Sequence, residues 1–286
     1  PHPKYSCWGY SFPWQTRTTL VPRGAPNLVC TVFVADALID AYEAIGDSRC
    51  RDLALSAAEY VHNDLYWAHG SEAGFSYPVP GARLQVHNAN LLGAALLCRA
   101  QPFERNKEFV RSALQVTRCS VSRQRPDGSW EYGEGANQQW VDNFHTGYNL
   151  CALRSIGHSL GTTEFEPCVA RGLAFYRQHF VRDDGAPRYF HDRTYPIDAH
   201  SVAQTVITLE TLKDLHADNV RLAHHVIRWA LEHMRDDQGF FYYRVLKFTT
   251  NRTSYMRWSQ AWMLLALATL LKDCSIGRNQ TTYQKA

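Results

Sequence analysis

The order of apolar and polar positions along the chain predicts two alternating kinds of helix. Four stretches, at about 49–65, 107–121, 164–181 and 219–235, place apolar residues on one helical face and Arg, Glu and His on the other. Other stretches, such as NANLLGAALL and SQAWMLLALATLL, are small and apolar nearly all round. A helix with a polar stripe faces solvent, whereas a helix without one must be buried on all sides. The pattern therefore predicts outer helices alternating with inner helices.

This alternation repeats with a fixed period. The entries to the inner helices recur every 56 to 59 residues, at Asn27, Val86, Asp142, Asp198 and Met256. A Gly-aromatic turn precedes four of these entries at intervals of 54 to 57 residues, beginning at Gly74, Gly128, Gly185 and Gly239. Two independent series with one period indicate a repeat architecture, in which each unit is one supersecondary element.

The predicted fold is all-α: an α/α toroid of repeated outer and inner helix pairs, with about five inner helices and short β-like loops at the mouth. We expect one domain over residues 1–286. Because only four outer helices are found, one is expected upstream of Pro1, unless the WGYSFPWQTR stretch closes the ring.

Composition and charge exclude several classes of protein. Hydrophobic residues make up 45% of the chain and charged residues 20%, which is typical of a globular protein. A net charge of +3 gives no reason to expect nucleic acid or an anionic membrane as partner. No apolar run approaches the roughly 20 residues of a membrane span, and no signal peptide opens the chain. The 8 cysteines include no CxxC pair, which favours reduced thiols and a cytoplasmic location. No metal or organic cofactor is implied.

In a toroid the N-terminal ends of the inner helices share one face, so polar residues there converge on one basin. The candidate substrate-binding residues are Arg23, Asn27, His87, Asn88, Trp130, Trp140, Asn143, Tyr148, Asp198, Arg257 and Trp258. Such a basin suits a sugar. The sugar ring stacks on aromatic side chains, and its hydroxyl groups form hydrogen bonds with carboxylates and amides. An arginine that faces such a basin is a natural clamp for a carboxylate, and Arg23 and Arg257 are the candidates.

The stretch QWVDNFHTGYNLCAL carries the candidate chemistry. Asp142 is a good helix N-cap, but capping leaves Asn143, His145 and Tyr148 unexplained. We predict Asp142 as the lead acid or base, with His145 and His200 as its proton-transfer partners. Hydrolysis would instead need a carboxylate pair, for which Asp198, Glu131 and Glu134 are available beside Asp142. The residues alone do not choose between these reactions.

Two resemblances bear on function. WVDNFHTGYNL resembles the Trp-x-Asp entry of unsaturated glucuronyl and rhamnogalacturonyl hydrolases, α/α-toroid enzymes in which the matching aspartate protonates the substrate. The resemblance implies that role for Asp142, although this chain departs from the pattern by carrying His145 and has no second catalytic Asp motif.

Nearly the whole chain resembles an uncharacterised bacterial group encoded among exopolysaccharide and lipopolysaccharide biosynthesis genes. The matching stretches are PRGAPNLVCTVFVADALIDAYE, VHNANLLGAALL, DNFHTGYNLCAL, IDAHSVAQ and RWSQAW. This resemblance implies a role in bacterial surface polysaccharide production, without naming a reaction. Glucuronyl C5-epimerases and N-acylglucosamine 2-epimerases are similar in fold only.

The sequence thus predicts a carbohydrate-active enzyme that acts on an acidic, uronate-type oligo- or polysaccharide, as a glycoside hydrolase or as a uronate epimerase or lyase. A glycan-binding toroid without catalysis is the first alternative, since it would keep the aromatic residues and arginines. Terpenoid chemistry is the second, because QRPDGSW fits the Gln-x-x-x-Gly-x-Trp motif of triterpene cyclases. That motif occurs in one good copy, and no Asp-x-Asp-Asp acid motif accompanies it.

Overall fold

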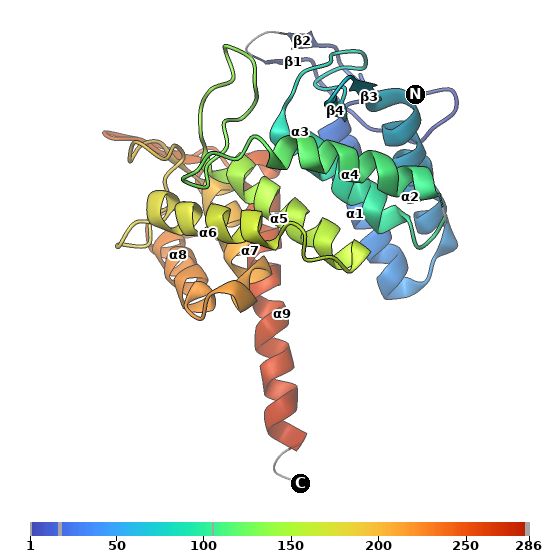
Figure 1. Ribbon diagram of the computed structural model, residues 1–286. Coiled ribbons are helices and arrows are strands. Elements are labelled where there is room, and N and C mark those ends of the chain that lie inside the picture. The colour runs from blue at the N-terminus through green and yellow to red at the C-terminus, as the bar shows by residue number, and fades with distance from the viewer. Residues whose placement is uncertain (1, 17–18, 105, 284–286) are drawn as a thin grey trace. The chain divides into compact units, whose positions relative to one another are not determined.

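The computed structural model describes residues 2–16, 19–104 and 106–283, with side chains described as far as Lys272 (Figure 1). Within these ranges the chain forms nine α-helices and seven strands of two to four residues, as expected for an all-α chain with short β-like loops. Its residues fall into two compact units. Unit 1 comprises Pro1–Pro126, Trp130–Trp140 and Ala152–Val169; unit 2 comprises Asp127–Ser129, Val141–Cys151 and Ala170–Ala286. The single domain over residues 1–286 stays a prediction.

Unit 1 is built around a helix that is buried along almost its whole length. This helix, α3 (His87–Ala100), exposes little besides Arg99. It packs against α1 (Leu28–Ile45), α2 (Ser48–Tyr60) and α4 (Lys107–Val121). A π-helical turn, Val61–Leu65, continues α2 into the hairpin of β3 (Tyr66–His69) and β4 (Glu72–Phe75). A second hairpin joins β1 (Trp14–Gln15) to β2 (Leu20–Val21).

Unit 2 holds the first turns of α5 (Asn143–Leu160), most of α6 (Glu166–Phe180), and all of α7 (Ala199–Thr211), α8 (Asn219–His233) and α9 (Ala261–Tyr283). The core of unit 2 lies between α7, α8 and α9, with Val206, Val226 and Met263 among its buried members. A three-stranded antiparallel sheet covers the entry to α7, in the order β5 (Ile197–Asp198), β6 (Arg244–Val245) and β7 (Thr250–Asn251).

The helices follow the predicted alternation closely. The predicted outer stretches at 107–121, 164–181 and 219–235 correspond to α4, α6 and α8 within two residues at each end. Side-chain caps account for the helix starts, because Asn27, Asp47, Asn106 and Asp198 each accept a backbone N–H from the first turn of the helix that follows. These short polar side chains satisfy donors that have no partner inside the helix.

Three of the four Gly-aromatic turns share one physical cause. Gly128, Gly185 and Gly239 have φ angles of 93°, 88° and 96°, a left-handed conformation in which a Cβ atom is strained. Gly74 differs, because it lies in strand β4 and is required for space: a Cβ there would come within 2.8 Å of the Trp67 ring. The repeat in sequence is therefore real, but its first member serves another purpose.

One prediction about burial was wrong. The SQAWMLLALATLL stretch was expected to be buried on all sides, yet Leu264, Leu265 and Leu271 on α9 are 69%, 48% and 64% exposed. The opposite face of α9, including Met263 and Ala266, packs into the core of unit 2. An apolar composition shows which helix can be buried, but the number of neighbours that cover it is set by tertiary packing.

The seven cysteines that the structure describes form no disulfide bonds. Among the described residues, no helix combines the length and the apolar character that a membrane crossing requires.

Candidate active site

The first turn of α5 is fixed by buried hydrogen bonds. The backbone N–H of Asn143 donates to the carbonyl of Tyr189 at 2.8 Å. The side chain of Asn143 is fully buried; its amide donates to Thr205 Oγ1 at 3.0 Å and its carbonyl oxygen accepts from the Tyr176 hydroxyl at 2.8 Å. These bonds tie α5 to α6 and α7, so the neighbouring side chains on α5 are held in fixed positions.

Asp142 caps α5 and holds His145 at the same time. Its Oδ1 accepts the backbone N–H of His145 at 3.0 Å, and its Oδ2 lies 2.7 Å from His145 Nδ1. The Asp142 side chain is completely buried, whereas the imidazole of His145 is 21% exposed. Two bonds from one buried carboxylate fix the orientation of the ring and favour the tautomer that carries its proton on Nδ1. The predicted capping role of Asp142 is confirmed.

His200 is the centre of an aromatic stack beside this pair. Its ring lies between Phe144, 4.3 Å away with an interplanar angle of 18°, and Trp262, 4.4 Å away with an angle of 22°. Its Nε2 lies 2.6 Å from the hydroxyl of Tyr148. The stack holds the imidazole from both faces, and the hydroxyl group fixes its rotation.

The surroundings of His200 keep its imidazole neutral. Burial, and to a lesser degree the neighbouring His145, lower the pKa of His200 from 6.5 to about 3. No carboxylate in the described part of the chain pairs with this stacked ring, so nothing there offsets the loss of hydration of its charged form. At neutral pH this histidine therefore carries one proton and can either donate or accept it through the Tyr148 hydroxyl.

The sheet of unit 2 brings an arginine to the second carboxylate of the site. The register of β5 and β6 pairs Asp198 with Arg244, and Arg244 Nη2 lies 3.1 Å from Asp198 Oδ2. Asp198 also caps α7, since its Oδ1 accepts the N–H of Ser201 at 2.8 Å. Burial raises the pKa of Asp198, while the bonds from Ser201 and Arg244 oppose that rise. The guanidinium of Arg244 lies over the rings of Tyr189 and Tyr243, 5.4 and 4.7 Å from their centroids.

Tyr189 connects the two carboxylates electrostatically. Burial raises its pKa well above the usual value for tyrosine, and the negative charges of Asp142 and Asp198 add to the effect. Its ring also meets Phe144 edge to face, with centroids 5.4 Å apart. One cluster of unit 2 therefore contains Asp142, Phe144, His145, Tyr189 and Asp198. The phenol of Tyr189 stays protonated at physiological pH.

The arrangement suits proton transfer better than attack by a carboxylate. Both aspartates are buried and bonded to a neighbouring cation or imidazole, so neither carboxylate faces solvent as a separate group. The more exposed group is the imidazole of His145, with its Nε2 turned away from Asp142. A histidine held this way is a common general base, and its carboxylate partner stabilises the imidazolium that forms. Among the described residues, no group of three or more His, Cys, Asp or Glu side chains is placed to hold a metal ion.

The other predicted residues of unit 2 lie directly before α9. Arg257 and Trp258 belong to a π-helical turn, Met256–Gln260, and both are exposed. The ring of Trp258 packs edge to face on Tyr255, which packs in the same way on Tyr243 beside Arg244. Aromatic contacts thus lead from Trp258, in the turn before α9, to the Asp198–Arg244 pair.

Six predicted residues belong to unit 1: Arg23, Asn27, His87, Asn88, Trp130 and Trp140. Asn27 caps α1 and is 2% exposed. Trp130 is 1% exposed and donates its indole N–H to the carbonyl of Ser120. Arg23 is exposed, and Trp140 stacks on Tyr132 at 4.4 Å.

His87 and Asn88 open α3 from inside the core of unit 1. His87 is 1% exposed, and its Nε2 lies 2.9 Å from Glu134 Oε1. Asn88 is 3% exposed. A substrate-binding role for the residues of both units remains a prediction, but His87 has a clear structural partner in Glu134.

The sequence did not single out Arg244, Phe144 or Trp262 as site residues. Arg244 follows the turn GFFYY directly, and the strand register then places it opposite Asp198. Arg244 stands directly after a Gly-aromatic turn, as Arg188 stands shortly after Gly185. This shared position could have marked Arg244 as a candidate site residue. Phe144 and Trp262 read as ordinary core residues, because their stacking on His200 depends on tertiary packing.

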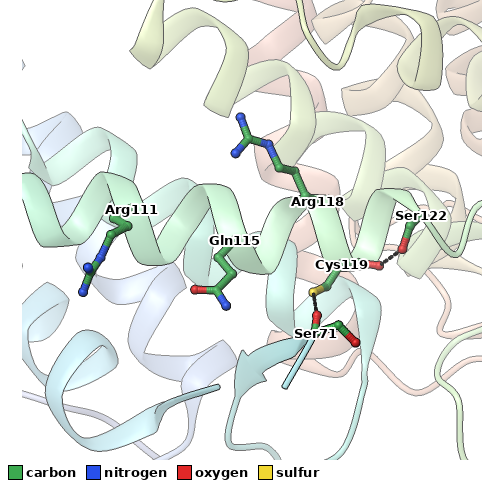
Figure 2. Close-up of a pocket in the computed structure, with 6 residues that line it drawn as sticks. All are labelled: Ser71, Arg111, Gln115, Arg118, Cys119 and Ser122. Atoms are coloured by element: carbon green, nitrogen blue, oxygen red, sulfur yellow. Dashed lines mark hydrogen bonds between the residues drawn. The ribbon is translucent and has the colours of Figure 1, made fainter. Parts of the chain in front are cut away.

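Three pockets are lined by residues that do not include Asp142, His145, Tyr148 or His200, although one of them includes Glu134, a predicted carboxylate candidate. Figure 2 shows the pocket over α4, about 380 Å³ in volume, in which Cys119 Sγ bonds to the carbonyl of Ser71. Its arginines are already neutralised, since Arg111 pairs with Glu108 and Arg118 with Glu164; it therefore offers little to a ligand. A second pocket, on unit 2, lies between α6 and α8, and a third lies against the β3–β4 hairpin of unit 1.

Comparison with known proteins identifies the fold. No protein family matches the sequence, and no curated protein matches it. Among solved structures, cellobiose 2-epimerase from Bacillus thermoamylovorans is similar with a TM-score of 0.68 at 11% identity, over 86% of this chain and 75% of that one. Unsaturated glucuronyl hydrolase from Bacillus sp. GL1 is similar with a TM-score of 0.65 at 16% identity, over 85% and 73%. A GH76 α-mannanase from Bacteroides thetaiotaomicron gives 0.65 at 9% identity, over 88% and 70%. The chain has the α/α-toroid fold, as predicted.

Proposed function

We propose that this chain is a carbohydrate-active enzyme that transfers a proton on an acidic, uronate-type glycan, acting as an epimerase or lyase. One observation carries the proposal: the completely buried carboxylate of Asp142 lies 2.7 Å from Nδ1 of the more exposed His145. The predicted roles of the two residues are thereby refined. His145 is the group that moves the proton, and Asp142 is the residue that positions it.

The chemistry of a uronate fits such a base. The C5 hydrogen lies next to the carboxyl group, so its removal leaves an electron pair that the carboxyl group can accept as an enolate. Nε2 of His145 takes this proton, and Asp142 stabilises the imidazolium that results. Return of a proton to the opposite face gives the epimer, whereas loss of the group at C4 gives an unsaturated sugar.

The second half of the cluster supplies a proton relay. Tyr148 and His200 share a hydrogen bond of 2.6 Å, and His200 remains neutral because its pKa is lowered to about 3. When the Tyr148 hydroxyl gives its proton to the sugar, the phenolate that remains accepts the N–H of the neutral His200, and the imidazolium of His145 balances its negative charge. This pair is the proposed donor when His145 is the acceptor.

Arginine is the expected partner of the substrate carboxylate. Arg244 bonds to Asp198 through Nη2 and is 28% exposed in its side chain. Its guanidinium has further N–H groups that can donate to a second carboxylate, and the rings of Tyr189 and Tyr243 hold it flat. We propose Arg244, with Arg257 beside the aromatic residues directly before α9, as the clamp that also stabilises the enolate.

A glycoside hydrolase is the second candidate. It is favoured by the Trp-x-Asp entry at Asp142 and by the likeness in fold to unsaturated glucuronyl hydrolase. Against it stands the placement of the two aspartates, since hydrolysis by a carboxylate pair needs two carboxyl groups that can reach the glycosidic bond, one as acid and one as base or nucleophile. Asp142 and Asp198 are both buried and both bonded to a basic group.

The biological setting rests on sequence resemblance. A role in bacterial surface polysaccharide metabolism and a cytoplasmic location remain proposals. The likeness to sugar epimerases and glycosidases supports a glycan substrate at the level of fold.

The test is incubation of the wild type and Asp142→Asn with uronate-containing oligosaccharides in deuterated water, followed by NMR and mass spectrometry. Deuterium at C5 with an intact chain identifies an epimerase, and an unsaturated product identifies a lyase. New reducing ends without label at C5 would replace this proposal by the hydrolase. An unchanged substrate whose signals broaden with the wild type would leave a glycan-binding protein.

A further inference from the structure

A pocket of about 510 Å³ lies against the β3–β4 hairpin of unit 1. Its size falls in the range of small-molecule sites. Elements distant in sequence contribute to it: the hairpin, the loop before α3, the end of α4 and the loop that follows. We call it the hairpin pocket, and its main lining residues are Trp67, Glu72, Arg83, Gln85, Arg123 and Glu134.

The aromatic wall of the hairpin pocket is held in a fixed position. Trp67 pairs with Gly74 across the hairpin, and its indole lies where a side chain at Gly74 would be, because a Cβ there would come within 2.8 Å of the ring. The ring is half-buried, so part of it is supported from behind while part lines the pocket. A rigid indole surface of this kind binds the apolar face of a sugar ring at little cost in conformational entropy.

The carboxylates of the pocket are fixed as acceptors. Gln85 Nε2 donates to Glu72 Oε2 at 2.8 Å, and Gln85 is itself held by the fully buried Asn90, whose amide donates to it at 2.7 Å. Glu134 Oε1 is bonded at 2.9 Å to the buried His87, and this bond is the first cause that lowers the pKa of Glu134. Oriented, ionised carboxylates are strong acceptors for the hydroxyl groups of a sugar.

Among the residues that the structure describes, the charges of the hairpin pocket leave Arg83 without a counter-ion. Arg123 Nη2 bonds to Glu72, and its Nη1 lies 3.8 Å from Glu134, so one guanidinium serves two carboxylates. Arg83 is exposed and has no hydrogen-bond or ion-pair partner within the described ranges 2–16, 19–104 and 106–272. A guanidinium at the rim binds a carboxylate with two parallel hydrogen bonds.

These features together define the ligand. We propose that the hairpin pocket is a second glycan-binding site, which stacks a sugar ring on Trp67, accepts its hydroxyl groups at Glu72 and Glu134, and holds its carboxylate at Arg83. An acidic peptide fits less well, because the two carboxylates repel it and it offers few hydroxyl donors. The proposal rests on the proposed function in one respect: the ligand is taken to be a uronate-containing glycan.

The test is binding, measured by isothermal titration calorimetry. The probes are uronate-containing oligosaccharides and the same oligosaccharides with their carboxyl groups reduced to alcohols. Trp67→Ala is expected to weaken binding of both forms about tenfold or more, since stacking does not depend on charge. Arg83→Gln is expected to weaken the acidic form by about tenfold and to leave the reduced form unchanged. Arg228→Gln, which removes an exposed arginine of unit 2, is the matched control and should bind as the wild type does.

Thermal unfolding of each variant separates lost binding from lost folding, and Trp67→Phe, which keeps a flat ring, should recover part of the affinity lost in Trp67→Ala. Wild-type affinity in Trp67→Ala and Arg83→Gln, or no binding of either probe by the wild type, overturns the proposal. The two proposals also fail in different ways. If binding depends on Trp67 but the wild type exchanges no deuterium, the proposed enzymatic function fails and the glycan-binding pocket stands. If the wild type exchanges deuterium but Trp67→Ala binds as the wild type does, the pocket proposal fails and the enzymatic function stands.

Discussion

The stability of unit 2 should depend on pH through His200, and the structure gives the size of the effect. The unfolded imidazole takes a proton below about pH 6.5, but in the folded protein its pKa is lowered to about 3 by burial and by His145. Between these values the unfolded state binds more protons than the folded state, so stability falls as the pH falls. At about pH 5 the loss from this group alone is about 2 kcal/mol.

The substitution that isolates this effect is His200→Gln. Glutamine can keep a hydrogen bond to the Tyr148 hydroxyl but has no group that titrates near neutrality, and it loses the stack on Phe144 and Trp262. We expect the variant to be less stable than the wild type near neutral pH by about 1–3 kcal/mol. Between neutral pH and about pH 5, the free energy of unfolding of the variant should fall by about 2 kcal/mol less than that of the wild type, because the variant lacks the contribution of His200.

Urea unfolding of both proteins at the two pH values measures this difference directly, because the contributions of all other groups cancel. His224→Gln, which removes an exposed histidine of α8, is the control for loss of an imidazole and should keep the wild-type profile. The reasoning is refuted if His200→Gln and the wild type lose the same free energy of unfolding on acidification.

Three further predictions concern neighbouring positions. Asp142→Asn should reduce kcat by a factor of about 10³–10⁴, since an amide N–H facing Nδ1 of His145 favours the tautomer whose Nε2 cannot accept a proton. Steady-state kinetics of a variant with an unchanged Tm would test this, and a decrease in kcat of less than tenfold would contradict it. Gly147→Ala should lower the free energy of unfolding by about 1–3 kcal/mol, because the new Cβ would meet Thr208 Oγ1 at 2.7 Å. An unaltered urea midpoint would contradict this and would mean that α7 shifts to make room for the methyl group. Arg244→Gln should raise KM for an acidic glycan about tenfold or more and leave a carboxyl-reduced glycan unaffected, so an equal effect on both would disprove the clamp.

Much of the fold could be predicted from the sequence because the repeat and the helical periodicity are local signals. The outer helices and the caps at Asp142 and Asp198 follow from the residues in one or two turns. The exposed face of α9 could not be predicted, since Leu264 and Leu271 would look the same in a helix that other elements cover completely. The different role of Gly74 was equally hidden, because it depends on the indole of Trp67 across the hairpin.

The candidate site was predicted in part. Asp142, His145, Tyr148 and His200 were selected because they lie at the N-terminal ends of predicted inner helices, and the structure brings these four into one cluster of unit 2. The sequence did not show which of these residues would act as the base and which would position it. Which of Asp142 and His145 is buried depends on how α5 meets the segment around Tyr189, a contact between residues more than forty positions apart. Arg244 was missed because a strand register, rather than a helix repeat, places it.

The central claim is that His145, positioned by Asp142, moves a proton on the sugar. The most direct test is the rate at which the wild type and His145→Gln exchange the C5 hydrogen of a uronate-containing oligosaccharide with deuterated water, with His233→Gln as a control on α8. The account predicts exchange by the wild type and the control, and a decrease of at least about a hundredfold in His145→Gln. Exchange by His145→Gln within about twofold of the wild-type rate would contradict it.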